Sequence, residues 1–174
     1  MPPKNHKTSS SPPKISVAFC CLGNYCRSPM AEAVFDHIVT QANLRQHFDL
    51  IDSCGTAGYH EGETPDQRTT AVLKKHGIKS TCLGRAVRQD DYYTFDYIFG
   101  MDGNNVKHLK EMAPRDGTAQ ILLFGQFDDK KPIYDPYYGI GGSGFDSTYE
   151  QCVRYSKVSL GMLRKSEGAE KTPD

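Results

Sequence analysis

The sequence predicts an α/β fold, in which a single domain is built on a central parallel sheet with helices on both faces. Short apolar runs rich in β-branched residues alternate along the chain with segments whose apolar residues recur at helical spacing. The 174 residues suffice for one domain with a sizeable core and are too few for two domains of ordinary size. In such a fold, functional sites lie at the carboxyl ends of the strands.

The N-terminal third begins with a tail and continues as strand, loop and helix. Residues 1–14 are rich in Pro, Ser and Lys and almost without apolar side chains, so they are predicted to be a disordered tail. The run ISVAFC at 15–20 suits a strand that is buried on both faces, and the loop CLGNYCR follows it directly. Ser28 and Pro29 are predicted as the N-cap and first residue of the next helix.

The middle of the chain repeats this alternation without repeating the sequence. The run FDLIDS at 48–53 predicts a second strand. Residues 64–67, Thr-Pro-Asp-Gln, are predicted as a capping box with proline at the first helical position, and Gly77 as the end of that helix. A third strand at 97–101 leads into a helix of about ten residues that stops near Pro114.

The C-terminal part supplies the last strand and the last helix. Residues 121–124 predict the fourth strand, and a long loop follows it. Ser147 and Glu150 form a predicted capping box that opens the final helix. Beyond Lys165 the chain is polar, so residues 15–165 are predicted to be the folded domain and residues 166–174 a disordered C-terminal tail.

Composition narrows the classes of partner and cofactor. The 21 basic and 21 acidic residues balance, which gives no reason to expect nucleic acid or an anionic membrane as a partner. The N-terminus lacks the apolar segment of a signal peptide, and no run approaches the ~18 apolar residues of a membrane span, so we expect a cytoplasmic protein. There the six cysteines are expected as free thiols, and without a CxxC pair they do not fit a zinc site, so no metal is expected.

The loop CLGNYCR between the first strand and first helix has the composition of an anion site. Unpaired N–H groups and the positive end of the helix dipole favour an anion there, Gly23 permits a close backbone approach, and Asn24 tolerates a positive φ. Arg27 adds a planar fork for two oxygens of a tetrahedral oxyanion. Five residues separate it from Cys21, enough to circle one phosphate, and the same groups favour a thiolate that attacks phosphorus.

The other two cysteines of this segment have different predicted roles. Alternation along the strand should turn Cys20 away from Cys21, as a small buried hydrophobe. Cys26 is either a packing residue or a redox partner that traps an oxidised Cys21 as a disulfide.

The sequence resembles the low-molecular-weight protein tyrosine phosphatases in the signature C-x5-R-S of CLGNYCRSPMAEAVF. The likeness continues in the family's order through IDS, P-D-x-R, HGI, FDYI-x-x-MD and DPYYG, and it covers about residues 15–165. A lone C-x5-R is a weak signal, but an ordered series of this length is specific. The resemblance implies a three-layer sandwich with strand order 2-1-3-4, and hydrolysis of phosphotyrosine and small aryl phosphates to inorganic phosphate.

The family's roles carry over to matching positions. Cys21 resembles the nucleophile that forms a phosphocysteine, Arg27 the phosphate-binding residue, and Asp135 the general acid and base. The phosphate loop would comprise Leu22, Gly23, Asn24, Tyr25, Cys26, Arg27 and Ser28. Loop support would come from Asn24, Ser28, Ser53, His76 and Asp102. From the residues alone, His76 is instead a cation at a helix C-terminus, and Asp102 an N-cap.

Aromatic residues match the family's substrate cleft. These are Tyr25, Tyr59, His60, Tyr137 and Tyr138, and rings of this kind can pack around a phenyl group. Tyr25 departs from the pattern, because this position is usually aliphatic, and relatives that act on phosphoarginine carry a small residue there. The resemblance implies phosphotyrosine proteins as partners, no cofactor, and a monomer or weak homodimer.

Two alternatives remain open at this point. A thiol-dependent arsenate reductase resembles the fold and uses the same loop, but it needs a resolving pair of cysteines, and residues 80–90 offer only Cys82. A catalytically dead phosphotyrosine-binding module is the other alternative. Intact Cys21, Arg27 and Asp135 argue against such a module, because a binding protein has no need for the acid.

Overall fold

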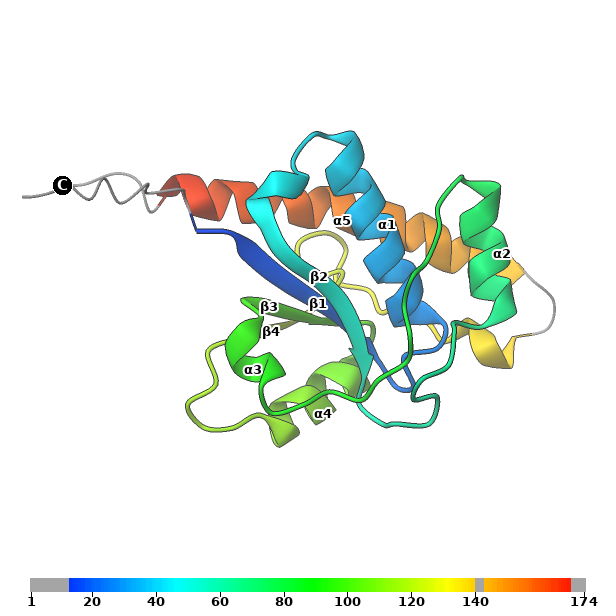
Figure 1. Ribbon diagram of the computed structural model, residues 1–174, viewed down its shortest axis with the longest axis horizontal. Helices are drawn as coiled ribbons and strands as arrows, with labels where there is room; N and C mark the ends of the chain where they lie inside the picture. Colours follow the sequence, from blue (N-terminus) through cyan, green and yellow to red (C-terminus); the bar gives the residue numbers. More distant parts are fainter. Residues whose placement is uncertain (1–12, 140–142, 170–174) are drawn as a thin grey trace, which may run out of the picture.

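Four parallel strands form the centre of the molecule (Figure 1). The structure is a computed structural model that describes residues 13–139 and 143–169. The strands are β1 (Ile15–Cys21), β2 (Phe48–Gly55), β3 (Tyr97–Gly100) and β4 (Gln120–Leu123). Their order is β2-β1-β3-β4, and every neighbouring pair is parallel, which confirms the predicted sheet.

Helices cover both faces of this sheet, as predicted. One layer holds α1 (Arg27–Gln41), α2 (Gln67–Lys75) and α5 (Ser143–Ala169), and the other holds α3 (Asp91–Thr94) and α4 (Gly103–Met112) (Figure 1). Two short 3-10 turns complete the described elements, η1 (Arg45–His47) and η2 (Pro136–Tyr138). None of the described helices is long and apolar enough to cross a membrane.

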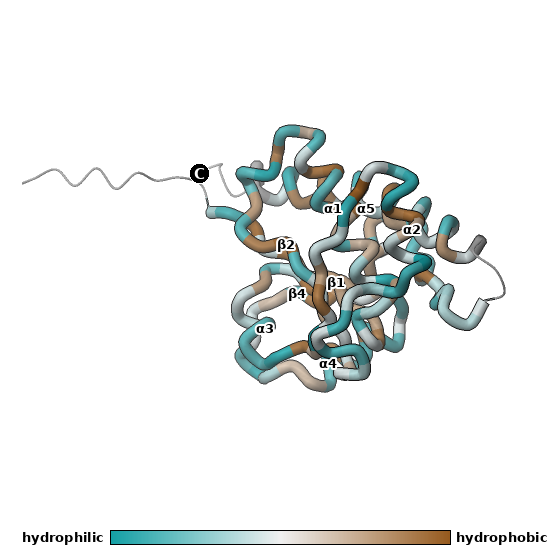
Figure 2. Tube along the Cα trace, turned by 45° about the vertical axis from the view of Figure 1, so that its right-hand side comes forward, coloured by the Kyte–Doolittle hydropathy of each residue, from teal (hydrophilic) through white to brown (hydrophobic). Residues whose placement is uncertain are grey.

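The core is divided by β1, which lies between β2 and β3. Val17, Phe19 and Cys21 belong to a hydrophobic cluster with residues of α1 and α5, whereas Ala18 and Cys20 belong to a second cluster with residues of α3 and α4. This alternation follows from the two-residue period of a strand. Figure 2 shows the hydrophobic trace of β1 in the middle of the molecule and hydrophilic connections around it.

Helix α1 begins two residues earlier than the sequence predicted, at Arg27 and not at Pro29. Arg27 is already helical, and Ser28 lies inside the first turn, so the predicted N-cap at Ser28 is wrong. The residue before the helix is Cys26, and its side chain makes no capping bond. The hydroxyl of Ser28 donates instead to the carbonyl of Cys54 on β2, at 3.2 Å.

The starts of α2 and α5 also differ from the prediction. Asp66, and not Thr64, is the N-cap of α2, and its carboxylate accepts the amide N–H of Arg68 at 2.8 Å. Aspartate is a better N-cap than threonine here because its carboxylate is negatively charged and lies at the positive end of the helix dipole. Helix α5 already begins at Ser143, so Ser147 lies within it.

The other strand and helix ends agree within two residues, except for the C-terminal end of α5, and the short helix α3 was not indicated by the sequence. Gly77 follows the end of α2 with φ of 71°, the conformation that favours glycine at this position. Helix α5 includes residues 166–169 of the predicted C-terminal tail. Residues 1–12 and 170–174 lie outside the described part of the chain, and so does the prediction that they are disordered.

Candidate active site

The loop between β1 and α1, residues 21–27, encloses a space lined by N–H groups; we call it the cysteine loop. Its carbonyls are bonded by the segments outside it. The bonds join Thr56 N to Cys21 O, Ala57 N to Leu22 O, Asp66 N to Tyr25 O and Thr69 Oγ1 to Cys26 O, at 2.9 to 3.1 Å. Because a peptide unit is planar and trans, an outward carbonyl turns the following N–H inward. The loop therefore directs several donors towards its own centre.

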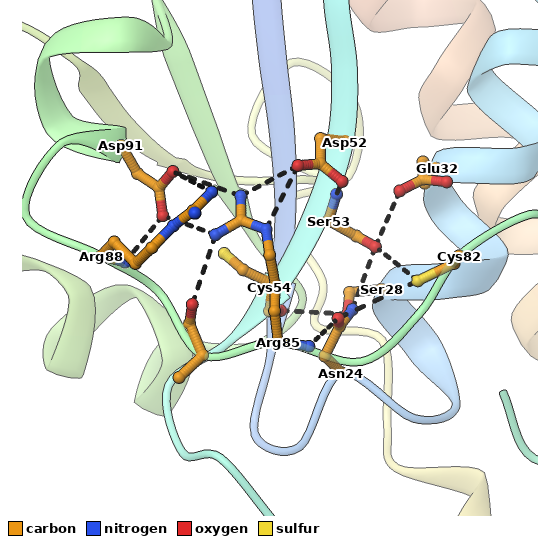
Figure 3. A network of polar contacts seen from close by, with 11 residues as sticks. Asn24, Ser28, Glu32, Asp52, Ser53, Cys54, Cys82, Arg85, Arg88 and Asp91 are labelled. Atoms are coloured by element: carbon orange, nitrogen blue, oxygen red, sulfur yellow. Dashed lines mark hydrogen bonds and ion pairs between the residues drawn. The ribbon is translucent and has the colours of Figure 1, made fainter. Parts of the chain in front are cut away.

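Asn24 holds the middle of the loop in place. Its φ is 52°, as its residue type allowed us to expect, and its side chain is buried. Its Nδ2 donates to Ser28 Oγ at 2.9 Å and to Ser53 Oγ at 3.0 Å, and its Oδ1 accepts the backbone N–H of Arg85 at 3.0 Å (Figure 3). These bonds tie the loop to α1, to β2 and to the segment that follows α2.

A glycine in β2 lets these segments approach the loop closely. A Cβ atom at Gly55 would lie 2.9 Å from the backbone N of Asn24 and 2.8 Å from the carbonyl oxygen of Ala57. Any other residue would push β2 and the cysteine loop apart, so the end of β2 requires glycine.

The thiol of Cys21 lies at the bottom of the loop. Its Sγ is 3.1 Å from Ser28 Oγ, and 3% of the residue is exposed. The residue lines a cavity of about 200 Å³ that opens to the surface. Cys20 is fully buried on the opposite face of β1, so the structure separates the two neighbouring cysteines as predicted.

Arg27 is the buried cation of the site. Its Nη1 donates to Asp102 Oδ2 at 2.6 Å and to the carbonyl of Ile133 at 2.9 Å, and its Nη2 is 3.7 Å from Asp135 Oδ2. Burial alone lowers the pKa of Arg27, but the neighbouring Cys21, Asp102 and Asp135 raise it above its ordinary value. The guanidinium therefore stays charged beside the thiol.

Asp102 has two roles, because each of its carboxylate oxygens has a different partner. Oδ2 accepts from Arg27, and Oδ1 accepts the backbone N–H of Asn105 at 2.8 Å. The side chain of Asn105 returns a bond to the backbone N–H of Asp102, which completes a capping box at the start of α4. Both interpretations of Asp102 from the sequence are thus realised in one side chain.

Asp135 reaches the site from the segment between β4 and α5. It is the N-cap of η2 and accepts the amide N–H of Tyr137 at 3.0 Å. Its side chain is 28% exposed and lines the same cavity as Cys21 and Arg27. A carboxyl group more than 100 residues away in the sequence thus reaches the space above the thiol.

Aromatic rings form the walls of the cavity. Tyr25 stacks on His60 with ring centroids 3.8 Å apart and an angle of 10° between the planes, and its ring contacts that of Tyr137 edge-on at 6.3 Å. His60 is fixed by Glu63, whose Oε2 is 2.7 Å from its Nδ1. The remaining wall residues, Tyr59 and Tyr138, are 71% and 77% exposed. The structure brings together all five residues predicted for the cleft.

His76 does not reach the cysteine loop, so its predicted supporting role is wrong. It follows the last residue of α2, is exposed, and stacks on Tyr149 of α5 with ring centroids 3.9 Å apart. The chain runs on from His76 before it reaches the loop, and there it supplies Cys82, whose Sγ is 3.3 Å from Ser53 Oγ.

Three residues around the loop escaped the sequence analysis: Glu32, Cys82 and Arg85. Glu32 accepts the hydroxyl of Ser53 at 2.9 Å, and Arg85 binds both Asp52 and Asp91 (Figure 3). The helical spacing of four between Ser28 and Glu32 was the available signal for Glu32. For Cys82 and Arg85 the segment has no periodic pattern from which to place them.

Cys26 also lines the cavity and is 5% exposed. Burial raises the pKa of its thiol well above the ordinary value, so it is a neutral thiol beside Cys21. Among the residues that the structure describes, no cluster of three or more His, Cys, Asp or Glu could hold a metal ion.

Comparison with known proteins places the chain in one family. The family model for low molecular weight phosphotyrosine protein phosphatase matches residues 16–166. The enzyme of that name from Schizosaccharomyces pombe is 47% identical over 149 residues, which are 84% of this chain and 95% of that protein. The one from Saccharomyces cerevisiae is 45% identical over 153 residues, or 85% and 94%. A crystal structure of a Drosophila arginine phosphatase has a TM-score of 0.81 and 37% identity, and the match covers 92% of this chain and 100% of that one. The chain belongs to the low molecular weight phosphotyrosine protein phosphatase family.

Proposed function

We propose that this protein is a protein tyrosine phosphatase, a phosphoric monoester hydrolase that acts through a phosphocysteine intermediate. The observation that supports this most is the convergence of Cys21, Arg27 and Asp135 on one cavity with aromatic walls. The cavity thus combines a nucleophile, a fixed cation and a carboxyl group, the three kinds of group that this reaction needs.

The cysteine loop binds the phosphate. Its inward N–H groups and the first turn of α1 donate to the phosphate oxygens, and Arg27 contributes a charged pair of donors. Asp102 and the carbonyl of Ile133 hold the guanidinium before substrate arrives. The same donors stabilise the charge that spreads over the equatorial oxygens in the transition state.

The first chemical step forms the intermediate. The thiolate of Cys21 attacks phosphorus, so that an S–P bond forms and the P–O bond to the phenol breaks. Asp135, in its protonated form, gives its proton to the departing phenolate oxygen. Ser28, whose Oγ is 3.1 Å from the sulfur, can turn its hydroxyl proton from the carbonyl of Cys54 to the thiolate. This bond keeps the nucleophile charged before the attack and stabilises it as a leaving group later.

The second step returns the enzyme to its starting state. Asp135, now a carboxylate, takes a proton from water as the water oxygen attacks phosphorus. The S–P bond breaks, Cys21 leaves as a thiolate, and inorganic phosphate is the product. Every group in this cycle belongs to the chain, so the proposal includes no cofactor.

The substrate is an aryl phosphate, with phosphotyrosine proteins as partners. The fold by itself does not select it, because one structural relative is an arginine phosphatase. The selection rests on the walls: Tyr25, held flat against His60, and the neighbouring Tyr137 present apolar ring surface to a phenyl group. We further propose that residues 15–165 are the catalytic domain, and that the protein acts in the cytoplasm as a monomer or weak homodimer.

The test is hydrolysis of p-nitrophenyl phosphate and of matched peptides carrying phosphotyrosine, phosphoserine or phosphoarginine, at about pH 5.5 with reduced protein. We expect turnover of the aryl phosphates and far slower release from the other two peptides. Cys21→Ser is the control that keeps the loop and removes the nucleophile. A folded, reduced sample without aryl phosphatase activity would overturn the proposed function. Equal rates on phosphoarginine would overturn the substrate class alone.

A further inference from the structure

Glu32 is a carboxyl group in the support of the cysteine loop for which the proposed reaction has no use. It lies on α1, one turn after Ser28, and is largely withdrawn from solvent against β2. Its Oε1 accepts the hydroxyl of Ser53 at 2.9 Å (Figure 3). In the described part of the chain, no Lys, Arg or His forms an ion pair with it.

Hydrogen bonds lead from this carboxyl to the thiol. Ser53 has one hydroxyl proton, and when it donates that proton to Glu32, its lone pairs face Asn24, whose Nδ2 lies 3.0 Å away. The same Nδ2 donates to Ser28 Oγ, which is 3.1 Å from Cys21 Sγ. The carboxyl and the sulfur are therefore joined through three side chains, all of which are buried.

The surroundings of Glu32 are short of positive charge. Asp52 on β2 and Asp36 on α1 are its acidic neighbours, and Cys82 reaches Ser53 from the segment after α2. The cation nearest in this network, Arg85, is bound to Asp52 and Asp91. Burial is the main cause that raises the pKa of Glu32 to about 7. The hydrogen bond from Ser53 lowers this pKa, and the nearby acids raise it further. The side chain thus changes charge near neutral pH.

We propose that Glu32 is a positioning residue for the reaction at Cys21: it orients Ser53 and Asn24, and it transmits its own change of charge to the cysteine loop. This inference rests on the proposed function. When Glu32 ionises, a negative charge enters a poorly solvated network behind the loop, where it disfavours both the thiolate and a bound phosphate anion. When Glu32 is protonated, its carbonyl oxygen still accepts from Ser53, so the loop keeps its support without that charge.

The test is the pH profile of kcat/KM for p-nitrophenyl phosphate in the wild type and in Glu32→Gln. The amide keeps an acceptor for Ser53 and cannot ionise. We expect similar activity of both proteins at about pH 5.5, and a Gln variant that retains about twofold to tenfold more of that activity at about pH 8. Profiles that run parallel throughout would overturn the inference.

A matched control removes an acid of the same helix and leaves the hydrogen bonds of the network in place. Asp36→Asn lies one turn further along α1, where Asp36 pairs with Arg45 at the surface. Because Asp36 contributes to the raised pKa of Glu32, the profile of this variant should keep the fall of the wild type with a midpoint at slightly lower pH. A flattened profile would instead show that any acidic charge on α1 has the same effect, and would overturn the inference. Ser53→Ala supplies the second control: with the link cut, Glu32→Gln should change the profile less than it does in the wild type.

A readout independent of turnover separates this inference from the proposed function. The rate of alkylation of Cys21 by iodoacetamide measures the thiolate, and it should rise relative to the wild type in Glu32→Gln at about pH 8. If the alkylation rate changes in Glu32→Gln but the protein has no phosphatase activity, the inference about Glu32 stands and the proposed function fails. If the protein is active but the alkylation rate is unchanged and the pH profiles are parallel, the proposed function stands and the inference about Glu32 fails. Thermal unfolding of each variant checks that it is folded.

Discussion

Asp102 joins the stability of α4 to the position of Arg27, the cation of the proposed reaction, and replacing Asp102 by asparagine tests that link. Its Oδ1 caps α4 through Asn105 N, and its Oδ2 holds Arg27 Nη1. An asparagine has a single carboxamide oxygen, so it can accept from one of these donors and must turn its NH₂ group towards the other. Two N–H donors would then face each other in a largely buried site.

The loss of stability in Asp102→Asn depends on which of the two donors, Arg27 or the backbone N–H of Asn105, keeps the carboxamide oxygen as its acceptor. A bond to the charged guanidinium contributes about 1.5–3 kcal/mol and an N-cap about 1 kcal/mol, so the oxygen should turn to Arg27. Asp102→Asn should therefore cost about 1 to 2 kcal/mol in the free energy of unfolding. It should also lower kcat/KM about tenfold, because Arg27 keeps a hydrogen bond and loses its opposite charge. Asp102→Ala loses both bonds and should cost about 3 kcal/mol, with a larger loss of activity.

Urea unfolding and kcat/KM for p-nitrophenyl phosphate, measured on the same samples, give the two quantities. Asn105→Ala is the matched control, since it removes the other half of the capping box and leaves the contact of Asp102 with Arg27 intact. It should reduce stability by about 1 kcal/mol with nearly unchanged activity. Full activity in Asp102→Ala would refute the reasoning, because it would mean that Arg27 is positioned without this carboxylate.

Three other predictions concern the cysteines and Glu32. Cys21→Ser should abolish turnover yet still bind phosphate, while Cys20→Ser should keep kcat close to the wild type. Equal losses of kcat in the two variants would show that Cys21 is not the nucleophile. Mild peroxide should oxidise Cys21 to a sulfenic acid, from which the thiol of Cys26 displaces water to form a disulfide that peptide mapping detects and dithiothreitol reverses. Because the pKa of Glu32 is raised from 4.5 to about 7, its contribution to stability is complete below pH ~4.5 and is lost as the pH rises through ~7. Urea unfolding should show the wild type losing up to about 3 kcal/mol relative to Glu32→Gln over that range, and a constant difference would count against the shift.

The fold and the cysteine loop were predictable because their signals are local. A buried strand, a glycine-containing turn and a helix start within about fifteen residues place Cys21 and Arg27 without any knowledge of the rest. The support of the loop is not local. Arg85 reaches Asn24 across 61 residues, and Asp102 reaches Arg27 across 75, so only the packed chain brings these pairs together.

His76 and Cys82 show how a motif misleads when the local geometry is missing. The HGI motif pointed to His76, but α2 ends there, and the helix end carries the ring towards Tyr149 and away from the loop. The side chain that reaches Ser53 comes six residues later, from a segment without regular structure. Such a segment is positioned by bonds at its two ends, which leave no periodic trace in the sequence.

The error at the start of α1 has a chemical reason. The first N–H groups of a helix have no acceptor within it, and an ordinary N-cap such as the predicted Ser28 satisfies one of them with its own side chain. Here the residue before the helix is Cys26, which provides no such bond, and Ser28 donates its hydroxyl to the carbonyl of Cys54, with its Oγ 3.1 Å from Cys21 Sγ. Under the proposed function, the donors that a cap would have occupied are left for an anion, and phosphate binding offsets the cost of the uncapped helix. A sequence rule that maximises helix stability therefore fails at this residue, since the proposed reaction needs those donors for its substrate.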